Sequence, residues 1–400
     1  MFKFRAIVAI AALIASFTVT TSANAEDLVV PKTSFAVCDA THLTYCVESV
    51  SVKAIGGTAE VLTFTPSGTA LTGNAPVNPS TTPGFAGSTS LAGTWTSATW
   101  GANGHADAGY DGIYIDAKAA NQWSNFLTVN VRPVIVDANK VAKNSVVAAG
   151  SNASSSLNLN ESVTIKLRTG IFKSGVSIGI ATSYSTTQGT DANGQNLTIV
   201  ATPTEVPVAS ASSQCTGETG VSAYKSNQLM ITYAPTNDPT GGFGVEGMTG
   251  NMSVATNGAC LASTPTWNSA ASQLAWTVAA PHFAPDGTTI NKGFYKAVIP
   301  AVDAGLLWGL TDIKAAAQAL VVSVTEDNGE PSTAINSITV KGSNIYIESS
   351  GFKYSKPMIK IKKSSKYKGF VSKKNLHCKQ GGKVYIYKGY ICPAGYSQVN

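Results

Sequence analysis

The chain carries few charged residues and few histidines. Aspartate, glutamate, lysine and arginine make up 12% of its 400 residues, about half the share usual in soluble domains. Only four residues are histidine, so a catalytic metal centre built from several histidines is not expected. The six cysteines include no C-x-x-C pair, which disfavours a zinc site. The chain is instead rich in serine, threonine, asparagine, glycine and alanine. This composition is typical of extracellular β-proteins.

Long apolar runs are also scarce, and the one that stands out lies at the N-terminus. Residues 6–17 form an apolar stretch behind two basic residues, and residues 23–25 read Ala-Asn-Ala. This order predicts a secretory signal peptide over residues 1–25, with the mature chain beginning at Glu26. The stretch is shorter than the roughly 20 residues that span a bilayer. We therefore expect a secreted, extracellular protein, with association to the cell wall as an option and no transmembrane span in the mature chain.

Cysteines in an exported chain predict disulfide bonds rather than reactive thiols. Six cysteines allow 15 connectivities, and proximity along the chain favours pairing in sequence order. Loops of 9, 46 and 15 residues would then be closed, stabilising the fold by roughly 2.6, 4.0 and 3 kcal/mol before any strain. The expected pairs are Cys38–Cys46, Cys215–Cys260 and Cys378–Cys392.

Acidic residues are absent from the last fifty positions. Residues 351–400 hold twelve lysines and no Asp or Glu, whereas residues 26–350 hold 14 basic and 22 acidic residues, a net charge of −8. A basic tail on an acidic body predicts electrostatic binding of an anionic cell-wall polymer or surface glycan, weakened by salt. Export argues against nucleic acid as the partner, and a merely solvated tail is the alternative. The candidate anion-binding residues are Lys360, Lys362, Lys363, Lys366, Lys368, Lys373, Lys374 and Lys383.

The mature length and the pattern of strands set the expected architecture. Short β-like runs alternate with turn clusters, and a chain of this length suggests more than one unit. Residues 144–160, rich in Ser, Asn and Ala, are the best linker candidate. We predict an all-β fold of two Ig-like or jelly-roll-type β-sandwich units, at residues 26–143 and 161–350, with a tail at 351–400.

Local signals place several elements within this outline. Residues 163–168 alternate apolar and polar side chains, as a half-buried strand does. Asn193-Gly194 is a hairpin-type turn before a strand at residues 197–201. One short helix is expected over residues 312–320, with Thr311 as its N-cap.

The tail contains a strand pattern at residues 383–387 and a turn on either side of it. On such a strand Lys383, Tyr385 and Tyr387 share one face, and Val384 and Ile386 share the other. A β-meander this small needs a staple, which a Cys378–Cys392 disulfide would supply.

The two cysteines of this meander lie in recognisable surroundings. Residues 378–383 read C-K-Q-G-G-K and residues 391–396 read I-C-P-A-G-Y. This segment, about the last 25 residues, resembles a Lys-rich C-terminal element with the pattern C-x-K-G-K … C-P-x-G-Y, found on secreted actinobacterial proteins of unknown function. It departs from that pattern at residues 380–382 and in its aromatic Tyr385 and Tyr387. The resemblance implies a surface-exposed bacterial product, and it implies no catalytic residue.

One motif raises the question of hydrolysis. Residues 175–179 read G-V-S-I-G, which matches the G-x-S-x-G nucleophile elbow around Ser177. That elbow requires a sharp turn from strand into helix, followed along the chain by an acid and a histidine. No helical periodicity follows Ile180, and the only later histidines are His282 and His377. The favoured interpretation is a glycine-punctuated strand with Ser177 at the surface, so no enzyme is expected, and a secreted hydrolase is the weaker alternative.

Two groups of acidic residues with a nearby histidine are candidate metal sites. His105 lies near Asp107, Asp111 and Asp116, but a calcium loop requires alternating oxygen ligands and a terminal Glu. Asp39 and His42 lie within the Cys38–Cys46 loop. Both clusters are interpreted as solvated polar loops, and neither a metal nor another cofactor is expected.

Aromatic residues offer an alternative function. Trp95, Trp100 and Trp123 lie in one β-rich stretch together with Tyr110 and Tyr114. Trp95 and Trp100 are five positions apart and would face opposite sides of a regular strand, so packing in the core is the first interpretation. Exposed coplanar rings would instead make a carbohydrate-binding β-sandwich protein, the alternative to a non-enzymatic cell-surface protein held by its basic tail.

Overall fold

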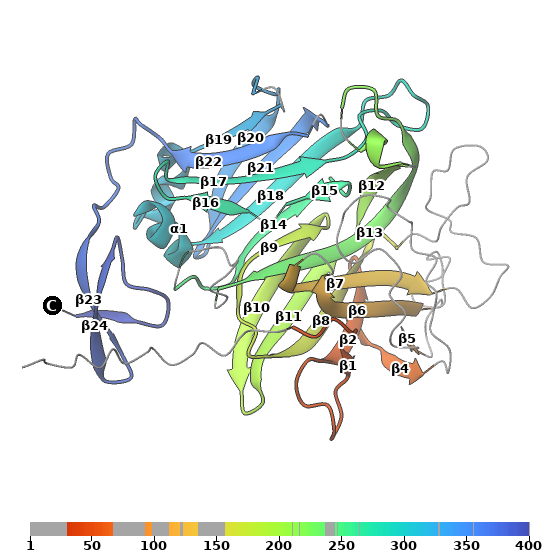
Figure 1. Cartoon of the computed structure of the whole chain (residues 1–400), viewed down its shortest axis with the longest axis horizontal. Coiled ribbons are helices and arrows are strands. Elements are labelled where there is room, and N and C mark those ends of the chain that lie inside the picture. The colour runs from red at the N-terminus through yellow and green to blue at the C-terminus, as the bar shows by residue number, and fades with distance from the viewer. Residues whose placement is uncertain are drawn as a thin grey trace, which may run out of the picture.

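The fold is built almost entirely of β-strands, with two short α-helices (Figure 1). The computed structural model describes residues 30–66, 93–97, 112–120, 123–134, 157–209, 211–215, 217–236, 245, 247–263, 265–326, 329–354 and 356–399. The expected all-β class is therefore confirmed. No described helix is long and apolar enough to cross a membrane.

One layer is a six-stranded sheet in the order β1-β2-β8-β11-β10, with β3 paired to β2. Strand β8 alternates buried and more exposed side chains along its first eight residues, as its sequence pattern predicts. Strands β10 and β11 form the expected hairpin, in which Asp191 pairs with Gly194 and Gly194 has a positive φ. The strands are β1 (Ala36–Val37), β2 (Cys46–Ala54), β3 (Glu60–Val61), β8 (Glu161–Gly170), β10 (Ser183–Asp191) and β11 (Gly194–Thr202).

The central layer is an eleven-stranded sheet in the order β20-β21-β18-β14-β9-β13-β7-β6-β5-β4, with β12 paired to β13. Its strands come from both sides of residues 144–160, since β7 pairs with β13. The strands are β4 (Thr63–Pro66), β5 (Gly93–Thr96), β6 (Gly112–Ala120), β7 (Trp123–Val134), β9 (Ser174–Ile180), β12 (Thr204–Ala209), β13 (Ser222–Pro235), β14 (Met252–Thr256), β18 (Lys292–Pro300), β20 (Ile335–Lys341) and β21 (Asn344–Lys353).

The third layer is a five-stranded sheet in the order β15-β17-β22-β19, with β16 paired to β17. Two short helices and two 3-10 turns accompany it. The elements are β15 (Leu261–Ala262), β16 (Thr266–Asn268), β17 (Gln273–Ala279), β19 (Leu320–Thr325), β22 (Met358–Lys363), α1 (Ala301–Trp308), α2 (Ala316–Ala319), η1 (Ser212–Gln214) and η2 (Ile313–Ala315).

Two hydrophobic cores lie on opposite faces of the central sheet. One joins the six-stranded sheet to β5, β6, β7 and β13, and it contains Ile165, Val129 and Tyr233. The other joins β9, β14, β18 and β21 to the five-stranded sheet and the helices, and it contains Trp276 and Ile361. The covering layers are thus staggered: each covers one face of the central sheet over a different set of strands.

The two units expected on either side of residues 144–160 share hydrogen-bonded sheets. Strand β2, from the first expected unit, pairs along its length with β8 from the second. The expected tail likewise begins inside the body, because β22 is an interior strand between β17 and β19. Its Ile359 and Ile361 are fully buried. The segment that leaves the body starts after Lys363.

The helices differ from expectation. The chain is helical at 313–319, within the expected range, but Asp312 rather than Thr311 is the N-cap, and its side chain accepts a hydrogen bond from the Lys314 N–H. The longer helix α1 was not expected from the sequence. It ends at Gly309 in the left-handed conformation, a common helix stop. Buried contacts of Leu307 and Trp308 outweigh the low helix propensity of Gly305.

The C-terminal segment folds into a three-stranded sheet, β24-β23-β25, at one side of the body (Figure 1). Its strands are β23 (Lys374–Gln380), β24 (Lys383–Gly389) and β25 (Ser397–Val399). We call residues 374–399 the C-terminal module. The Ala394 N–H donates to the Gly247 carbonyl oxygen at 2.8 Å, and the Val371 N–H donates to the Gly309 carbonyl oxygen at 3.0 Å.

All three expected disulfides are present: Cys38–Cys46, Cys215–Cys260 and Cys378–Cys392. Their Cα atoms lie 4.9, 5.4 and 5.7 Å apart, within the range that a disulfide spans. The third bond lies in the small core of the C-terminal module, with Leu376, Tyr387 and Tyr396 around it.

Candidate functional site

A groove lies where the six-stranded sheet stops covering the central sheet. Among the described strands, β10 is the edge of the six-stranded sheet. Beyond it, one face of β18, β21 and β20 is left open, while their other face packs in the second core. The groove consists of two hollows of about 170 and 470 Å³ that share Tyr184, Ser253, Val298 and Tyr346.

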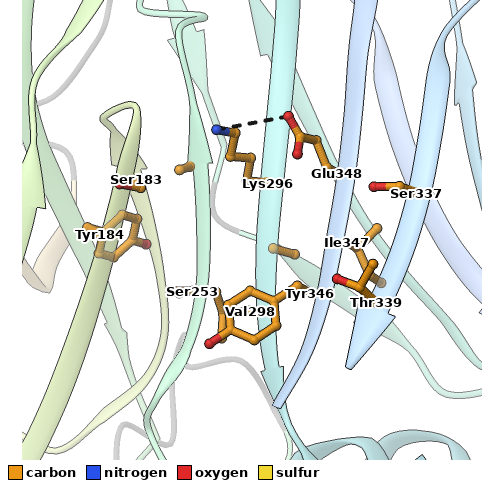
Figure 2. Close-up of a pocket in the computed structure, with 12 residues that line it drawn as sticks. Ser183, Tyr184, Ser253, Lys296, Val298, Ser337, Thr339, Tyr346, Ile347 and Glu348 are labelled. Carbon is orange, nitrogen blue, oxygen red and sulfur yellow. Dashed lines mark ion pairs between the residues drawn. The ribbon is translucent and has the colours of Figure 1, made fainter. Parts of the chain in front are cut away.

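The floor of the groove is formed by two rows of side chains that cross the strands. In one row Ser253 pairs with Val298, Val298 with Tyr346, and Tyr346 with Thr339. The neighbouring row runs through Ala255, Lys296, Glu348 and Ser337 by the same pairings. Residues two apart on a strand share a face, so both rows point into the groove. Figure 2 shows the Tyr346 side chain reaching from β21 across Val298 toward Ser253.

One wall of the groove is strand β10, and Tyr184 fixes its position. The Tyr184 ring lies against Gly179 of β9, where an added Cβ would meet the ring carbon Cε1 at 2.6 Å. Its hydroxyl donates to the Ser177 Oγ at 2.9 Å and accepts from the Val254 N–H at 3.2 Å. Burial raises the pKa of Tyr184, so this hydroxyl stays protonated. The polar residues of β10 that line the groove are Ser183, Ser185, Thr186 and Thr187.

The far end of the groove lies at the start of α1. It is lined by Ser343 and Asn344 from the β20–β21 turn, and by Thr249 and Asn251 ahead of β14. The Asn251 Oδ1 atom is buried and has no hydrogen-bond partner among the described residues. This end therefore offers amide and hydroxyl groups, one of them unsatisfied.

Charge is balanced within the groove. The Lys296 Nζ and a Glu348 oxygen lie 3.9 Å apart (Figure 2), and both side chains are partly exposed. Behind the far end, Asp303 is fully buried and accepts hydrogen bonds from the Thr249 N–H at 2.8 Å and the Thr249 Oγ1 at 2.7 Å. Burial raises the pKa of Asp303 to about 6. The groove thus presents many neutral hydrogen-bonding groups and one opposed pair of charges.

Ser177 is not at the surface, which corrects the sequence interpretation. It lies in the middle of β9 and is fully buried, where its Oγ donates to the Met252 carbonyl oxygen at 3.4 Å. The chain continues from β9 into β10 without a helix. His282 lies elsewhere, with Nδ1 2.9 Å from the Tyr354 carbonyl oxygen. The arrangement that a nucleophile elbow requires is therefore not formed around Ser177.

Of the three tryptophans considered for sugar binding, only Trp95 has a side chain that the structure describes. Trp95 is buried in the first core, with its ring centroid 5.4 Å from that of Phe64. Trp100 lies outside the described residues, and of Trp123 only the backbone, at the start of β7, is described. Core packing of Trp95, the first interpretation from the sequence, is confirmed.

Of the two acidic clusters, the Asp39–His42 loop is exposed as expected, whereas Asp116 is fully buried in β6 rather than solvated. Asp39 accepts hydrogen bonds from Thr41 and from the His42 N–H, which lower the pKa of its carboxyl group. Asp116 is buried beside Lys118, at 3.2 Å, whereas residues 105–111 lie outside the described residues, as does the expected signal peptide. No group of three or more His, Cys, Asp or Glu side chains suited to a metal occurs in the part of the chain that the structure describes.

The candidate lysines divide into three settings. Lys360 and Lys362 lie on the outer face of β22, opposite the buried Ile359 and Ile361. The remaining lysines lie in residues 364–373, which we call the linking segment, or in the C-terminal module: Lys366, Lys368, Lys373, Lys374 and Lys383, all exposed.

Lys363 forms the third setting and connects the body to the C-terminal module. Its Nζ lies 4.6 Å from the ring centroids of both Phe370 and Tyr390 and donates to the Tyr390 hydroxyl at 3.3 Å. Lys373 lies over the same Tyr390 ring at 5.2 Å. These cation–π contacts stabilise the position of the linking segment.

Comparison with known proteins gives no relative: no family model, no curated protein and no solved structure matches the chain. The groove itself was not predicted from the sequence. Its residues come from β10, β14, β18, β20 and β21, and scattered serines and threonines carry no spacing signal that would reveal a shared surface.

Proposed function

We propose that this chain is an extracellular, non-enzymatic protein that binds an extended, neutral glycan in the groove beside β10. The groove is the observation that carries the proposal. Three disulfides support an oxidising, extracytoplasmic environment. The signal peptide expected at residues 1–25 is consistent with that location.

The chemistry of the groove suits a sugar chain. Ligand sites generally combine apolar surface with a few placed polar groups, and here Val298 and the Tyr346 ring lie among serine, threonine and asparagine side chains. A tyrosine ring offers an apolar face and a polar edge, which matches the two kinds of surface that a pyranose presents. The Lys296–Glu348 pair leaves the site without a strong net charge, so a neutral ligand is favoured.

The length of the groove favours a chain over a single small molecule. Lining residues on β18 extend from Lys296 to Pro300, four positions that cover roughly 13 Å along a strand. An extended peptide would instead be recognised through apolar pockets for alternate side chains. Where such pockets would have to lie, the floor of the groove presents the polar side chains of Ser337, Thr339 and Glu348.

The test is calorimetric titration of the full mature chain with neutral oligosaccharides of α- and β-linked glucose, xylose, galactose and N-acetylglucosamine. We expect one class to bind, and Tyr346→Ala to weaken that binding at least tenfold, equivalent to about 1.4 kcal/mol. Tyr385→Ala, which removes a partly exposed tyrosine far from the groove, is the matched control. Equal affinity in Tyr346→Ala, or no binding by any of the sugars, would overturn the proposal.

A second function is supported by the lysines, as an attachment to anionic cell-wall polymer. Lys360, Lys362, Lys366 and Lys368 belong to a stretch of fifty residues without an acidic side chain, and at 0.15 M salt the Debye length is about 8 Å. Their replacement by Gln should reduce retention on isolated walls, and added salt should do the same. If neither the Gln replacements nor added salt reduces retention on the walls, these lysines only make the protein more soluble and the attachment proposal is wrong.

A further inference from the structure

The C-terminal module has one face that its own core does not use. On β24, Val384 and Ile386 are 53% and 70% exposed. The strand register places them at the ends of two rows that cross the sheet, Ile386–His377–Val399 and Val384–Lys379–Ser397. Lys388 extends the same face beside Asn375. We call this set the outer face of the module.

The opposite face of the module accounts for its stability. Tyr387 and Tyr396 pack beside the Cys378–Cys392 disulfide, and the Tyr385 and Tyr387 rings make edge-on contacts with Tyr396, at 5.7 and 5.4 Å between centroids. The module docks on the body through a separate segment, in which Ile391 lies against Gly305 of α1. The outer face is needed for neither contact.

The charge of the outer face limits what can cover it. Lys379 and Lys388 lie on it, Lys374 and Lys383 lie at the strand ends, and the last fifty residues contain no acidic side chain. A second copy of the module would bring like charges together. A purely polar polyanion would match the lysines but leave the exposed aliphatic side chains without a partner.

We propose that the outer face binds an anionic lipid surface. Val384 and Ile386 then enter the region between head groups and acyl chains, while Lys379 and Lys388 contact the lipid phosphates. Aliphatic side chains bordered by cations, on a surface that does not span the bilayer, are the combination that peripheral membrane binding requires. This inference does not depend on the glycan groove.

The test is sedimentation of the full mature chain with vesicles of phosphatidylcholine alone, or of phosphatidylcholine mixed with phosphatidylglycerol. We expect binding to the mixed vesicles only, with a decrease at raised salt. Val384→Ser with Ile386→Ser should reduce binding at least tenfold, and Lys379→Gln with Lys388→Gln should do so as well. The control pair Ile55→Ser with Val61→Ser, at body positions that are 79% and 72% exposed, should bind as the wild type does.

Three further arms separate this proposal from its alternatives. All variants should keep the thermal unfolding midpoint of the wild type, because the altered side chains lie outside the cores. Tyr346→Ala should bind vesicles normally, so failure of the glycan proposal and failure of this one are distinguishable. If Val384→Ser with Ile386→Ser binds vesicles as the wild type does while the lysine variant does not, the module is a site for polyanions in general, and the lipid proposal is overturned.

Discussion

The Tyr184 hydroxyl donates a hydrogen bond of 2.9 Å to the Ser177 Oγ, which joins the edge strand of one sheet to the middle of another. Both groups are buried, and the Tyr184 hydroxyl also accepts from the Val254 N–H. Three strands, β9, β10 and β14, therefore meet at one phenol oxygen. The same contact positions the wall of the groove, because Ser183 and Ser185 flank Tyr184 on β10.

Tyr184→Phe should destabilise the protein by about 1 to 3 kcal/mol. The substitution keeps the ring against Gly179 but removes two buried hydrogen bonds, to the Ser177 Oγ and from the Val254 N–H, each worth about 0.5 to 1.5 kcal/mol. Urea unfolding followed by tryptophan fluorescence measures the change. Tyr385→Phe, in the C-terminal module, is the control and should be close to neutral, and equal unfolding midpoints for wild type and Tyr184→Phe would contradict the account.

Gly179→Ala should destabilise the protein through overpacking rather than through backbone strain. The added methyl group would lie 2.6 Å from the Tyr184 Cε1 atom, so the ring has to move, at a cost of about 1 to 3 kcal/mol. Because that movement shifts β10, glycan affinity should fall together with stability. Gly389→Ala is the control, since the nearest atom to its added methyl, the Ile391 carbonyl oxygen, is 3.5 Å away. A Gly179→Ala protein of unchanged stability would mean that the two sheets are more loosely packed than described.

Asp303 should make stability fall as the pH rises. Its pKa is raised from 3.8 to about 6 by burial, so between about pH 4 and pH 6 the folded chain holds a proton that the unfolded chain has lost. The free energy of unfolding is therefore highest at the acid end of this window. It falls by up to about 3 kcal/mol as the pH rises from 4 to above 6. Asp303→Asn keeps an oxygen for the Thr249 N–H and cannot ionise.

The measurement is the difference in unfolding free energy between wild type and Asp303→Asn at pH 4, 5, 6 and 7. The unfolding free energy of the variant, relative to that of the wild type, should rise from pH 4 to pH 6 and stay constant above pH 6. Asp286→Asn is the control, because hydrogen bonds from Thr289 and then Thr288 lower the pKa of its exposed carboxyl group to about 2, below the range measured. Parallel curves for wild type and Asp303→Asn would show that Asp303 does not carry the pH dependence.

Loss of the Cys378–Cys392 disulfide should loosen the C-terminal module and leave the body folded. The bond closes a loop of 15 residues and stabilises it by roughly 3 kcal/mol, whereas the two large cores contain no residue of the module. A Cys378→Ser, Cys392→Ser double variant should be cut by protease within residues 374–399 and keep the wild-type thermal transition of the body. A body transition lowered by several degrees would indicate that the module supports the core through Ile391.

Elements with a local signal were predictable from the sequence. The alternation in residues 163–168 predicts β8, the Asn193-Gly194 turn predicts the β10–β11 hairpin, and proximity predicts the disulfide pairs. Strand β22 also had a local signal, because Ile359 and Ile361 alternate with Lys360 and Lys362 as in a half-buried strand. The high lysine content of the surrounding residues conceals that alternation, so the sequence analysis assigns these residues to a basic tail outside the β-body.

The groove and the burial of Ser177 could not be predicted in the same way. Whether Ser177 is exposed depends on which layer covers β9, and that layer is β10 with Tyr184. The floor of the groove depends on pairings between β14, β18, β21 and β20, which bring together positions as far apart as Ser253 and Tyr346. Sheet order is a property of tertiary packing, and a period-two pattern within one strand does not reveal its neighbours.

The interior place of β22 also sets a time order for folding. Leu274 of β17 pairs with Ile361 of β22, and the 87 residues from Ala275 to Ile361 take roughly 4 to 17 s to synthesise at 5 to 20 residues per second. Until that late strand arrives, β17 and β19 have no strand between them, and the buried side chains of the second core stay exposed. A chain of such long-range pairings folds slowly, so the apolar side chains of the second core are open to contact with other chains until β22 has joined its neighbours.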